Sequence, residues 1–358
     1  MQYIIDQLAD NIRAAAGRKV PLCIRSGGSK DFYGNRIAGQ AEFLDPTAYT
    51  GIVDYEPTEL VVTARAGTHL ADLETELNKH GQMLAFEPPH FGTAATLGGS
   101  VAAGLSGPRR ASAGAVRDFV LGVRMLDGRG DDLRFGGQVM KNVAGYDVSR
   151  LMTGSMGTLG LLLEVSLKVL PLPAVEITLR MPMKEADAIH RMNLWAGKPL
   201  SISATCFYDD ELTLRLSGAE PAVRAAHAKL GGEEIDDGAD FWKSVREQTH
   251  PFFQSGQTLW RLSIKSTAQP LPLPLPGKQL IEWGGALRWW ASDAGMDAEA
   301  MRIMAKAASG HATLFRGQKL DAAAFHPLAP GMMGIHRRLK EKFDPMGILN
   351  PGRMYPQF

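Results

Sequence analysis

Cysteine is scarce in this sequence, because only Cys23 and Cys206 occur among its 358 residues. Both lie in apolar, strand-like runs, in different halves of the chain. Two thiols allow one disulfide at most, and they are too few for an iron–sulfur cluster, which takes about four cysteine ligands. We therefore expect buried, reduced thiols in a cytoplasmic protein.

An excess of charge of one sign is also missing, since 39 Lys and Arg residues face 38 Asp and Glu residues. A net charge of +1 gives no electrostatic case for a nucleic acid or an anionic membrane as partner. No run of 18 or more apolar residues is present, so no segment is predicted to span a bilayer. Near the start, Ile4, Ile5, Leu8 and Ile12 have the spacing of one helix face, which indicates a helix rather than a signal peptide.

The common nucleotide fingerprints are absent too. No G-x-G-x-x-G motif follows a strand and opens a helix, and no G-x-x-x-x-G-K-[ST] motif occurs. These absences argue against a Rossmann domain and against a P-loop NTPase. A phosphate-bearing ligand would have to be held in another way.

Length and pattern predict two domains of α+β class. Short β-rich runs alternate with helical patterns up to Pro173, among them a helix from Thr68 to His80, with Thr68 as N-cap and Gly81 as its end. From Val175 the order β-α-β-β-α is ferredoxin-like and implies an antiparallel sheet. We predict domains at residues 1–173 and 174–332, with a C-terminal segment at 333–358 that returns to the first.

Glycine, in contrast, is abundant in the first half, in "RSGGS" (25–29), "TLGGSVAAGLSG" (96–107) and "GSMGTLG" (154–160). Gly27 and Gly28 lie two residues beyond the apolar strand Val20 to Ile24. They form either an ordinary turn or a nest of inward-pointing N–H groups that binds phosphate. These residues alone leave both interpretations open.

Taken in order, the glycine clusters resemble the vanillyl-alcohol-oxidase family of flavoproteins, whose FAD domain is also called PCMH-type. The resemblance also covers "GIVDYEPTELVVTARAGTHLADLETEL", "KNVAGYDVSRLMTGSMGTLGLLLEVSLKV" and the closing "FDPMGILNPGR". It implies a PCMH-type FAD-binding domain followed by a cap domain with a ferredoxin-like antiparallel sheet.

In this family the first glycine loop wraps the FAD pyrophosphate, and the resemblance gives the same role to Gly27, Gly28 and the adjacent serines. It further implies that a Cβ at Gly98 or Gly99 would collide with the cofactor. Lys30 either adds charge or faces solvent. The implied cofactor-binding residues are Arg25, Ser26, Gly27, Gly28, Ser29, Gly67, Thr96, Gly98, Gly99, Ser100, Gly107, Gly157, Thr158, Leu159, Gly160 and Arg353.

Two departures from the family pattern concern the flavin link and the metal. Relatives with covalent flavin carry His in "RSGGHS" or Cys in a second loop, whereas this chain has Ser29 and a cysteine-free "HFGTAATLGG", which implies noncovalent FAD. Metal-binding relatives carry H-x-G-D-G-N-x-H, where this chain has only "GHATLFRG", so we expect no metal. The catalytic residues stay unknown, and the candidates are His311, Arg316 and Arg353. A lone His at the head of a strand is more often structural, and a solvated face explains Arg316 as well.

Within the family, "SGPRRASAGAVRDFVLG" and "GHATLFRG" resemble the FAD-binding subunits of glycolate oxidases. The resemblance implies oxidation of glycolate, or a similar short 2-hydroxy acid, to glyoxylate or its analogue. The implied partners are a related flavoprotein subunit and an iron–sulfur subunit that passes electrons toward membrane quinones, so a membrane is reached only through them. The alternatives are a non-catalytic FAD-binding assembly or electron-relay subunit, and an independent sugar or aldonolactone oxidase.

Overall fold

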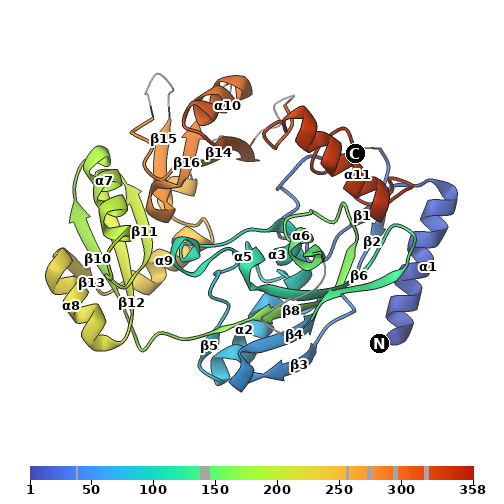
Figure 1. Ribbon diagram of the computed structural model, residues 1–358, viewed down its shortest axis with the longest axis horizontal. Helices are drawn as coiled ribbons and strands as arrows, with labels where there is room; N and C mark the ends of the chain where they lie inside the picture. Colours follow the sequence, from blue (N-terminus) through green and yellow to red (C-terminus); the bar gives the residue numbers. More distant parts are fainter. Residues whose placement is uncertain (38, 138–145, 255–257, 272–276, 293–296, 318–321) are drawn as a thin grey trace.

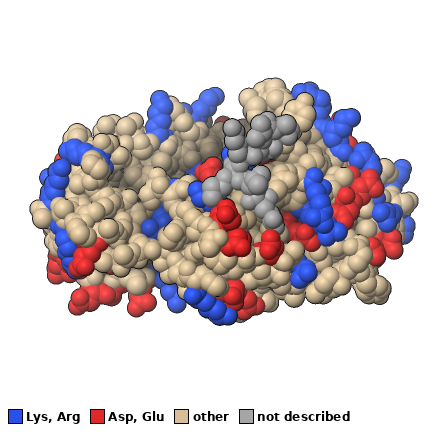
Figure 2. Space-filling view, turned by 60° about the horizontal axis from the view of Figure 1, so that its bottom comes forward, with Lys and Arg blue, Asp and Glu red and all other residues tan. Residues whose placement is uncertain are grey.

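The computed structural model describes residues 1–358 except 38, 138–145, 255–257, 272–276, 293–296 and 318–321. Figure 1 shows two units beside each other, each built around its own antiparallel sheet. On the face shown in Figure 2, residues of both charge signs are interspersed, and the surface between the units is recessed. No helix within the described ranges is long and apolar enough to cross a membrane.

The first unit contains a five-stranded sheet of order β3-β4-β8-β6-β7 and two small two-stranded sheets, β1 with β2 and β5 with β9. Its strands are β1 (Leu22–Ile24), β2 (Glu42–Leu44), β3 (Ile52–Glu56), β4 (Val61–Arg65), β5 (Gln82–Met83), β6 (Val120–Leu126), β7 (Asp132–Gly136), β8 (Leu161–Lys168) and β9 (Leu170–Pro171). Its helices are α1 (Gln2–Arg18), the 3₁₀ turn η1 (Pro57–Glu59), α2 (Leu70–Lys79), α3 (Leu97–Ala103), α4 (Arg110–Ala113), α5 (Val116–Phe119) and α6 (Val148–Leu151).

Helices of the first unit follow the apolar spacing of the sequence. Helix α1 buries Ile5, Leu8 and Ile12 along one face, as the pattern predicts. Helix α2 is shorter than expected and its predicted cap is wrong. His69 occupies the N-cap position, because the Thr68 hydroxyl instead accepts a hydrogen bond from the Gly51 N–H at 2.9 Å.

The second unit is a single eight-stranded sheet of order β13-β10-β12-β11-β15-β16-β14-β17. Its elements are β10 (Val175–Pro182), α7 (Glu185–Ala196), β11 (Ile202–Tyr208), β12 (Glu211–Gly218), α8 (Glu220–Leu230), β13 (Glu233–Ile235), α9 (Gly238–Arg246), η2 (Pro251–Gln254), β14 (Thr258–Ser263), β15 (Lys278–Glu282), η3 (Trp283–Gly285), β16 (Leu287–Ser292), α10 (Ala298–Ala307) and β17 (His311–Arg316). The first four strands have the ferredoxin-like order that the sequence predicts. The later strands extend the same sheet.

The two faces of this sheet have different partners. Helices α7 and α8 cover one face of its ferredoxin-like half, and α10 covers the same face of the other half. The opposite face carries Leu259, Trp289 and Phe315, which pack against Tyr33 and Met156 of the first unit. The sheet is thus buried on both sides, and its inner face forms one wall of the region between the units.

The last helix, α11 (Pro330–Phe343), returns the chain to the first unit (Figure 1). It ends at Phe343, with Asp344 in the C-cap position directly before Pro345. Beyond it, Leu349 forms a parallel bridge with Leu22 of β1. Residues from the two ends of the chain therefore meet beside β1.

Candidate cofactor site

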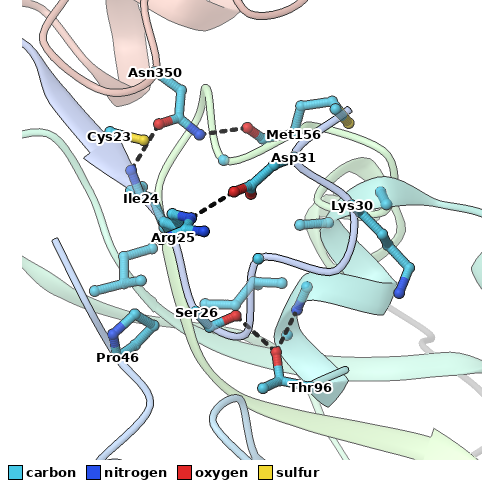
Figure 3. A pocket seen from close by; sticks show the side chains of 18 of the residues that line it. Cys23, Ile24, Arg25, Ser26, Lys30, Asp31, Pro46, Thr96, Met156 and Asn350 are labelled. Carbon is cyan, nitrogen blue, oxygen red and sulfur yellow. Dashed lines mark hydrogen bonds and ion pairs between the residues drawn. The ribbon is translucent and has the colours of Figure 1, made fainter. Parts of the chain in front are cut away.

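A cavity of about 540 Å³ lies where four distant segments of the first unit meet (Figure 3). These segments are the end of β1 with the loop after it, the start of α3, the loop before β8 and the tail after α11. All three glycine clusters of the sequence reach its wall. The predicted residues that line it are 25–29, Thr96, Gly98, Gly99, Gly157, Gly160 and Arg353.

The loop after β1 has a backbone that only glycine permits. A Cβ on Gly27 would lie 1.5 Å from the Ala94 carbonyl oxygen, and Gly28 has φ +69°. Within the described part of the chain, the N–H groups of residues 26–29 donate to no acceptor. Four free amide donors on a cavity wall form a site for an anion such as a diphosphate.

Two cations accompany this loop, and they differ in environment. Arg25 is half exposed and pairs with Asp31 at 2.5 Å, so its charge is already balanced. Lys30 is part-buried and donates to the His90 carbonyl at 3.3 Å and to the Ser29 hydroxyl at 3.2 Å. Burial lowers the pKa of Lys30 to about 8. Lys30 is therefore the less compensated of the two charges.

Helix α3 begins at the cavity, and its glycines serve packing as well as access. Thr96 caps the helix by accepting from the Gly99 N–H at 3.2 Å, and its hydroxyl lies 2.7 Å from that of Ser26. A Cβ on Gly98 would lie 2.6 Å from the Ala66 Cβ. A side chain at Gly98 would therefore meet the protein's own β4–α2 connection, and its collision with the cofactor stays a prediction.

Asn350 connects three of the four segments. Its Nδ2 donates to the Met156 carbonyl at 2.7 Å, and its Oδ1 accepts from the Ile24 N–H at 2.8 Å. A Cβ on Gly157 would lie 2.6 Å from that same Nδ2, and Gly157 has φ +70°. Sequence reasoning missed Asn350, although it stands three residues before Arg353 in the "NPGR" motif.

Arg353 lines the cavity, but its guanidinium donates hydrogen bonds to backbone carbonyls. Its guanidinium donates to the carbonyls of Asn35 at 2.9 Å, Asp31 at 3.0 Å and Lys30 at 3.4 Å. These bonds hold the loop of residues 30–35 against the tail.

Five of the predicted cofactor residues do not line the cavity, namely Gly67, Ser100, Gly107, Thr158 and Leu159. Gly67 is needed for packing, because a Cβ there would lie 2.7 Å from the carbonyl oxygens of Pro46 and Thr47. The Gly107 carbonyl accepts from the Trp283 indole at 3.1 Å. The glycine clusters of the sequence therefore correspond to loops at the cavity. The pattern did not distinguish the residues that line the cavity from those that pack behind them.

The candidates from the second unit lie outside this cavity. His311 begins β17, with its ring centroid 6.4 Å from that of His326. The Arg316 guanidinium lies 4.5 Å from the ring centroid of Phe32. No three His, Cys, Asp or Glu residues among those described gather as a possible metal site.

The residues present fit FAD. The free amides of residues 26–29 suit its diphosphate, and the remaining wall is mostly apolar, with Ala66, Ala103, Met156 and Leu162, as flat aromatic rings require. Cys23 also lines the cavity, but burial raises the pKa of its thiol. It is therefore protonated and a poor nucleophile at neutral pH.

Comparisons with known proteins agree with this geometry. A family model described as an FAD binding domain matches residues 5–136. Solved structures of alkyldihydroxyacetonephosphate synthase superpose with a TM-score of 0.67 at 16% identity, covering 97% of this chain and 74% of that one. Fold and site together define a flavoprotein oxidoreductase with a PCMH-type FAD-binding domain.

Sequence relatives identify the family more closely. The chain is 49% identical over 350 residues, 98% of its own length and 97% of the relative's, to glycolate oxidase subunit GlcE of Escherichia coli (strain K12). It is 30% identical over 183 residues to a D-lactate dehydrogenase of Anaerostipes hadrus, and 29% identical over 183 residues to glycolate oxidase subunit GlcD of Bacillus subtilis (strain 168). These two matches cover 51% of this chain and 38% and 39% of the relatives. The chain belongs to the family of glycolate oxidase subunit GlcE.

Proposed function

We propose that this chain is the FAD-binding subunit of a complex that oxidises glycolate, or a similar short 2-hydroxy acid, to the 2-oxo acid. The observation that carries the proposal is the cavity whose wall presents the free amides of residues 26–29. The family relationship supplies the substrate class. Bound FAD supplies a two-electron acceptor for the hydride that leaves the carbinol carbon, while the hydroxyl loses a proton.

The chain's own residues bind and orient the cofactor. The amides of residues 26–29 hold the diphosphate, and Lys30 adds positive charge beside it. Asn350 fixes the loop at Met156 relative to β1, and its side chain lines the cavity. The proposal includes noncovalent attachment, since Ser29 stands where covalent relatives carry His and the Cys23 thiol is protonated.

Electrons then leave for a partner. We propose a related flavoprotein subunit and an iron–sulfur subunit as the other members of the complex, because two cysteines give this chain no cluster of its own. The complex would lie in the cytoplasm and reach a membrane only through these partners.

A second candidate function is FAD-dependent assembly or electron relay, with the substrate oxidised on the related flavoprotein. The absence of a metal-ligand group among the described residues favours it. Anaerobic mixing of the lone FAD-loaded chain with glycolate separates the two, by following the loss of oxidised-flavin absorbance. Complete loss of the oxidised-flavin absorbance in the lone chain assigns the oxidation of glycolate to this chain. Loss that requires the related flavoprotein assigns the oxidation to that partner.

Purification tests the cofactor. The chain should be yellow, and acid or heat precipitation should release all of its flavin into the supernatant as FAD. Colour that stays with the denatured protein would contradict noncovalent attachment. A chain that binds no FAD at micromolar concentration would contradict the proposed function.

A further inference from the structure

Arg110 and Arg261 lie against the same indole ring, although one belongs to α4 of the first unit and the other to β14 of the second. Their guanidinium carbons lie 4.3 Å and 5.1 Å from the ring centroid of Trp283. Arg261 also lies 6.0 Å from the ring centroid of Trp289, its cross-strand neighbour on β16. Two cations from different units thus meet at one aromatic platform.

Neither arginine has a carboxylate partner among the described residues, since none lies within 4 Å of them. Three other buried arginines behave differently. Arg109 lies 2.6 Å from Glu176, Arg215 lies 2.7 Å from Glu87, and Arg124 is paired with two acids. Buried charge is normally compensated, so an unpaired pair of arginines points to an external anion.

Burial outweighs the compensation that Glu282 gives to Arg261 and Asp118 gives to Arg110, and neither acid forms an ion pair with its arginine. Burial lowers the pKa of Arg261, and burial followed by the charge of Arg261 lowers that of Arg110. A buried acid on the same sheet face, Glu282, accepts a hydrogen bond from the Trp289 indole at 2.7 Å. Burial raises the pKa of Glu282 to about 7, so it carries only part of its charge near neutral pH.

The position of this pair connects it to the cofactor cavity. Trp283 and Trp289 belong to one packed cluster with Ala103 and Met156, and the last two also line the cavity. The aromatic platform and part of the cavity wall therefore belong to the same cluster of side chains.

We propose that Arg110 and Arg261, on either side of the boundary between the units, bind the carboxylate of a short 2-hydroxy or 2-oxo acid at the Trp283 platform. Guanidinium groups bind carboxylates through parallel N–H donors, and an aromatic platform fixes the plane of such a group. Because the two arginines come from different units, the site forms only when the units are docked. This inference rests on the proposed function, because it assigns the carboxylate of that reaction.

The test measures binding without turnover. The probe is 2-hydroxy-2-methylpropanoate, which has no hydrogen on its carbinol carbon and so cannot lose a hydride, titrated calorimetrically into the FAD-loaded full chain. FAD affinity is measured first, by flavin fluorescence, for each variant. Arg261→Met and Arg110→Met should each raise the probe's dissociation constant by about tenfold or more, since each removes a charge-assisted hydrogen bond. Arg261→Lys and Arg110→Lys, which keep the charge, should bind more tightly than the methionine variants.

Arg191→Met is the matched control, because Arg191 also lies over a tryptophan, 5.9 Å from the ring centroid of Trp195, but on exposed α7. It should leave probe binding unchanged, and neutral glycolamide should bind far more weakly than the probe. Wild-type protein that binds FAD but not the probe would overturn the inference, as would methionine variants that bind the probe normally. Failure of the wild type to bind FAD would instead overturn the proposed function.

Discussion

Gly28 and Gly98 both line the cofactor cavity, yet their missing side chains serve different ends. Gly28 has φ +69°, and a Cβ there would meet only the end of the flexible Arg25 side chain. A Cβ on Gly98 would meet the Ala66 Cβ at 2.6 Å and its carbonyl oxygen at 3.0 Å. One glycine shapes the phosphate loop, and the other lets α3 approach β4.

Alanine substitutions should separate these roles. Gly98→Ala should lower the melting temperature of the FAD-free chain by several degrees. The added methyl group overpacks a rigid contact between α3 and Ala66, which should lower the free energy of unfolding by about 1–3 kcal/mol. Gly28→Ala should lower it less and weaken FAD binding more. Thermal unfolding and flavin titration of both variants check this. A Gly98→Ala variant that is fully stable but unable to bind FAD would restore the simpler view that this glycine faces the cofactor.

Lys30 should make FAD binding depend on pH. Its pKa of about 8 in the free protein is below the ordinary lysine value, and a bound diphosphate favours the charged form. Below about pH 8 the lysine is already protonated and affinity is at its plateau. Above it, binding must take up a proton, so the dissociation constant should rise by up to about tenfold per pH unit.

Flavin titrations between pH 6 and pH 10 measure this dependence. Lys30→Met should weaken binding at pH 7 and flatten the profile, while Lys229→Met, on an exposed face of α8, should do neither. An identical profile in wild type and Lys30→Met would show that another group titrates.

At the scale of elements, α11 is held to the first unit by a buried charge. The Lys340 ammonium donates to Asp344 at 2.6 Å and to the carbonyls of Leu349 at 2.6 Å and Thr158 at 2.8 Å. Its side chain and that of Asp344 are 5% and 0% exposed, so neither charge can turn to water. One lysine thus joins the last helix, the tail and the loop before β8.

Lys340→Met should therefore destabilise the chain by about 3 kcal/mol, because it leaves the Asp344 carboxylate buried without its counter-ion. Lys342→Met, two residues along the same helix and exposed, should change stability by less than about 0.5 kcal/mol. Urea unfolding at pH 7 compares them. Equal stabilities of the two variants would mean that the helix is held by its apolar contacts alone.

The sequence predicts elements better than it predicts supporting contacts. Strands and helices from β10 to α8 follow from period and turn signals, because local spacing decides which face is buried. Asn350, Lys340 and the arginine pair at Trp283 could not be found in this way. Their partners lie up to 326 positions away, as for Asn350 and Ile24, and no local pattern records such a pairing.

Across the whole molecule, the two units are joined by buried ion pairs as well as by aromatic packing. Arg215 of β12 lies 2.7 Å from Glu87, and Arg109 lies 2.6 Å from Glu176 of β10. Against the effect of burial, the charges of Arg215 and Arg109 and a hydrogen bond from Ser217 hold the pKa of Glu176 below its usual value. This crossed arrangement fixes the inner face of the large sheet over the first unit.

Arg215→Met should loosen this connection, because Glu87 then keeps only Arg109 as a partner. We expect the calorimetric unfolding transition of the variant to broaden or divide in two, with a loss of about 3 kcal/mol or more. The control is Arg224→Met, whose pair with Glu234 is exposed. A single sharp transition at the wild-type temperature in Arg215→Met would show that the aromatic cluster alone joins the units.

The meeting of Asn350 with Ile24 and Met156 sets an order of events during biosynthesis. A ribosome that has translated the glycine loops has made most of the phosphate site, yet Asn350, which ties those loops together, is translated 194 residues after Met156. Before Asn350 is in place, the glycine loops of the nascent chain form an open surface rather than a closed cavity. The closed cavity therefore forms only once Asn350 has been translated, so tight binding of the cofactor must follow synthesis of the glycine loops.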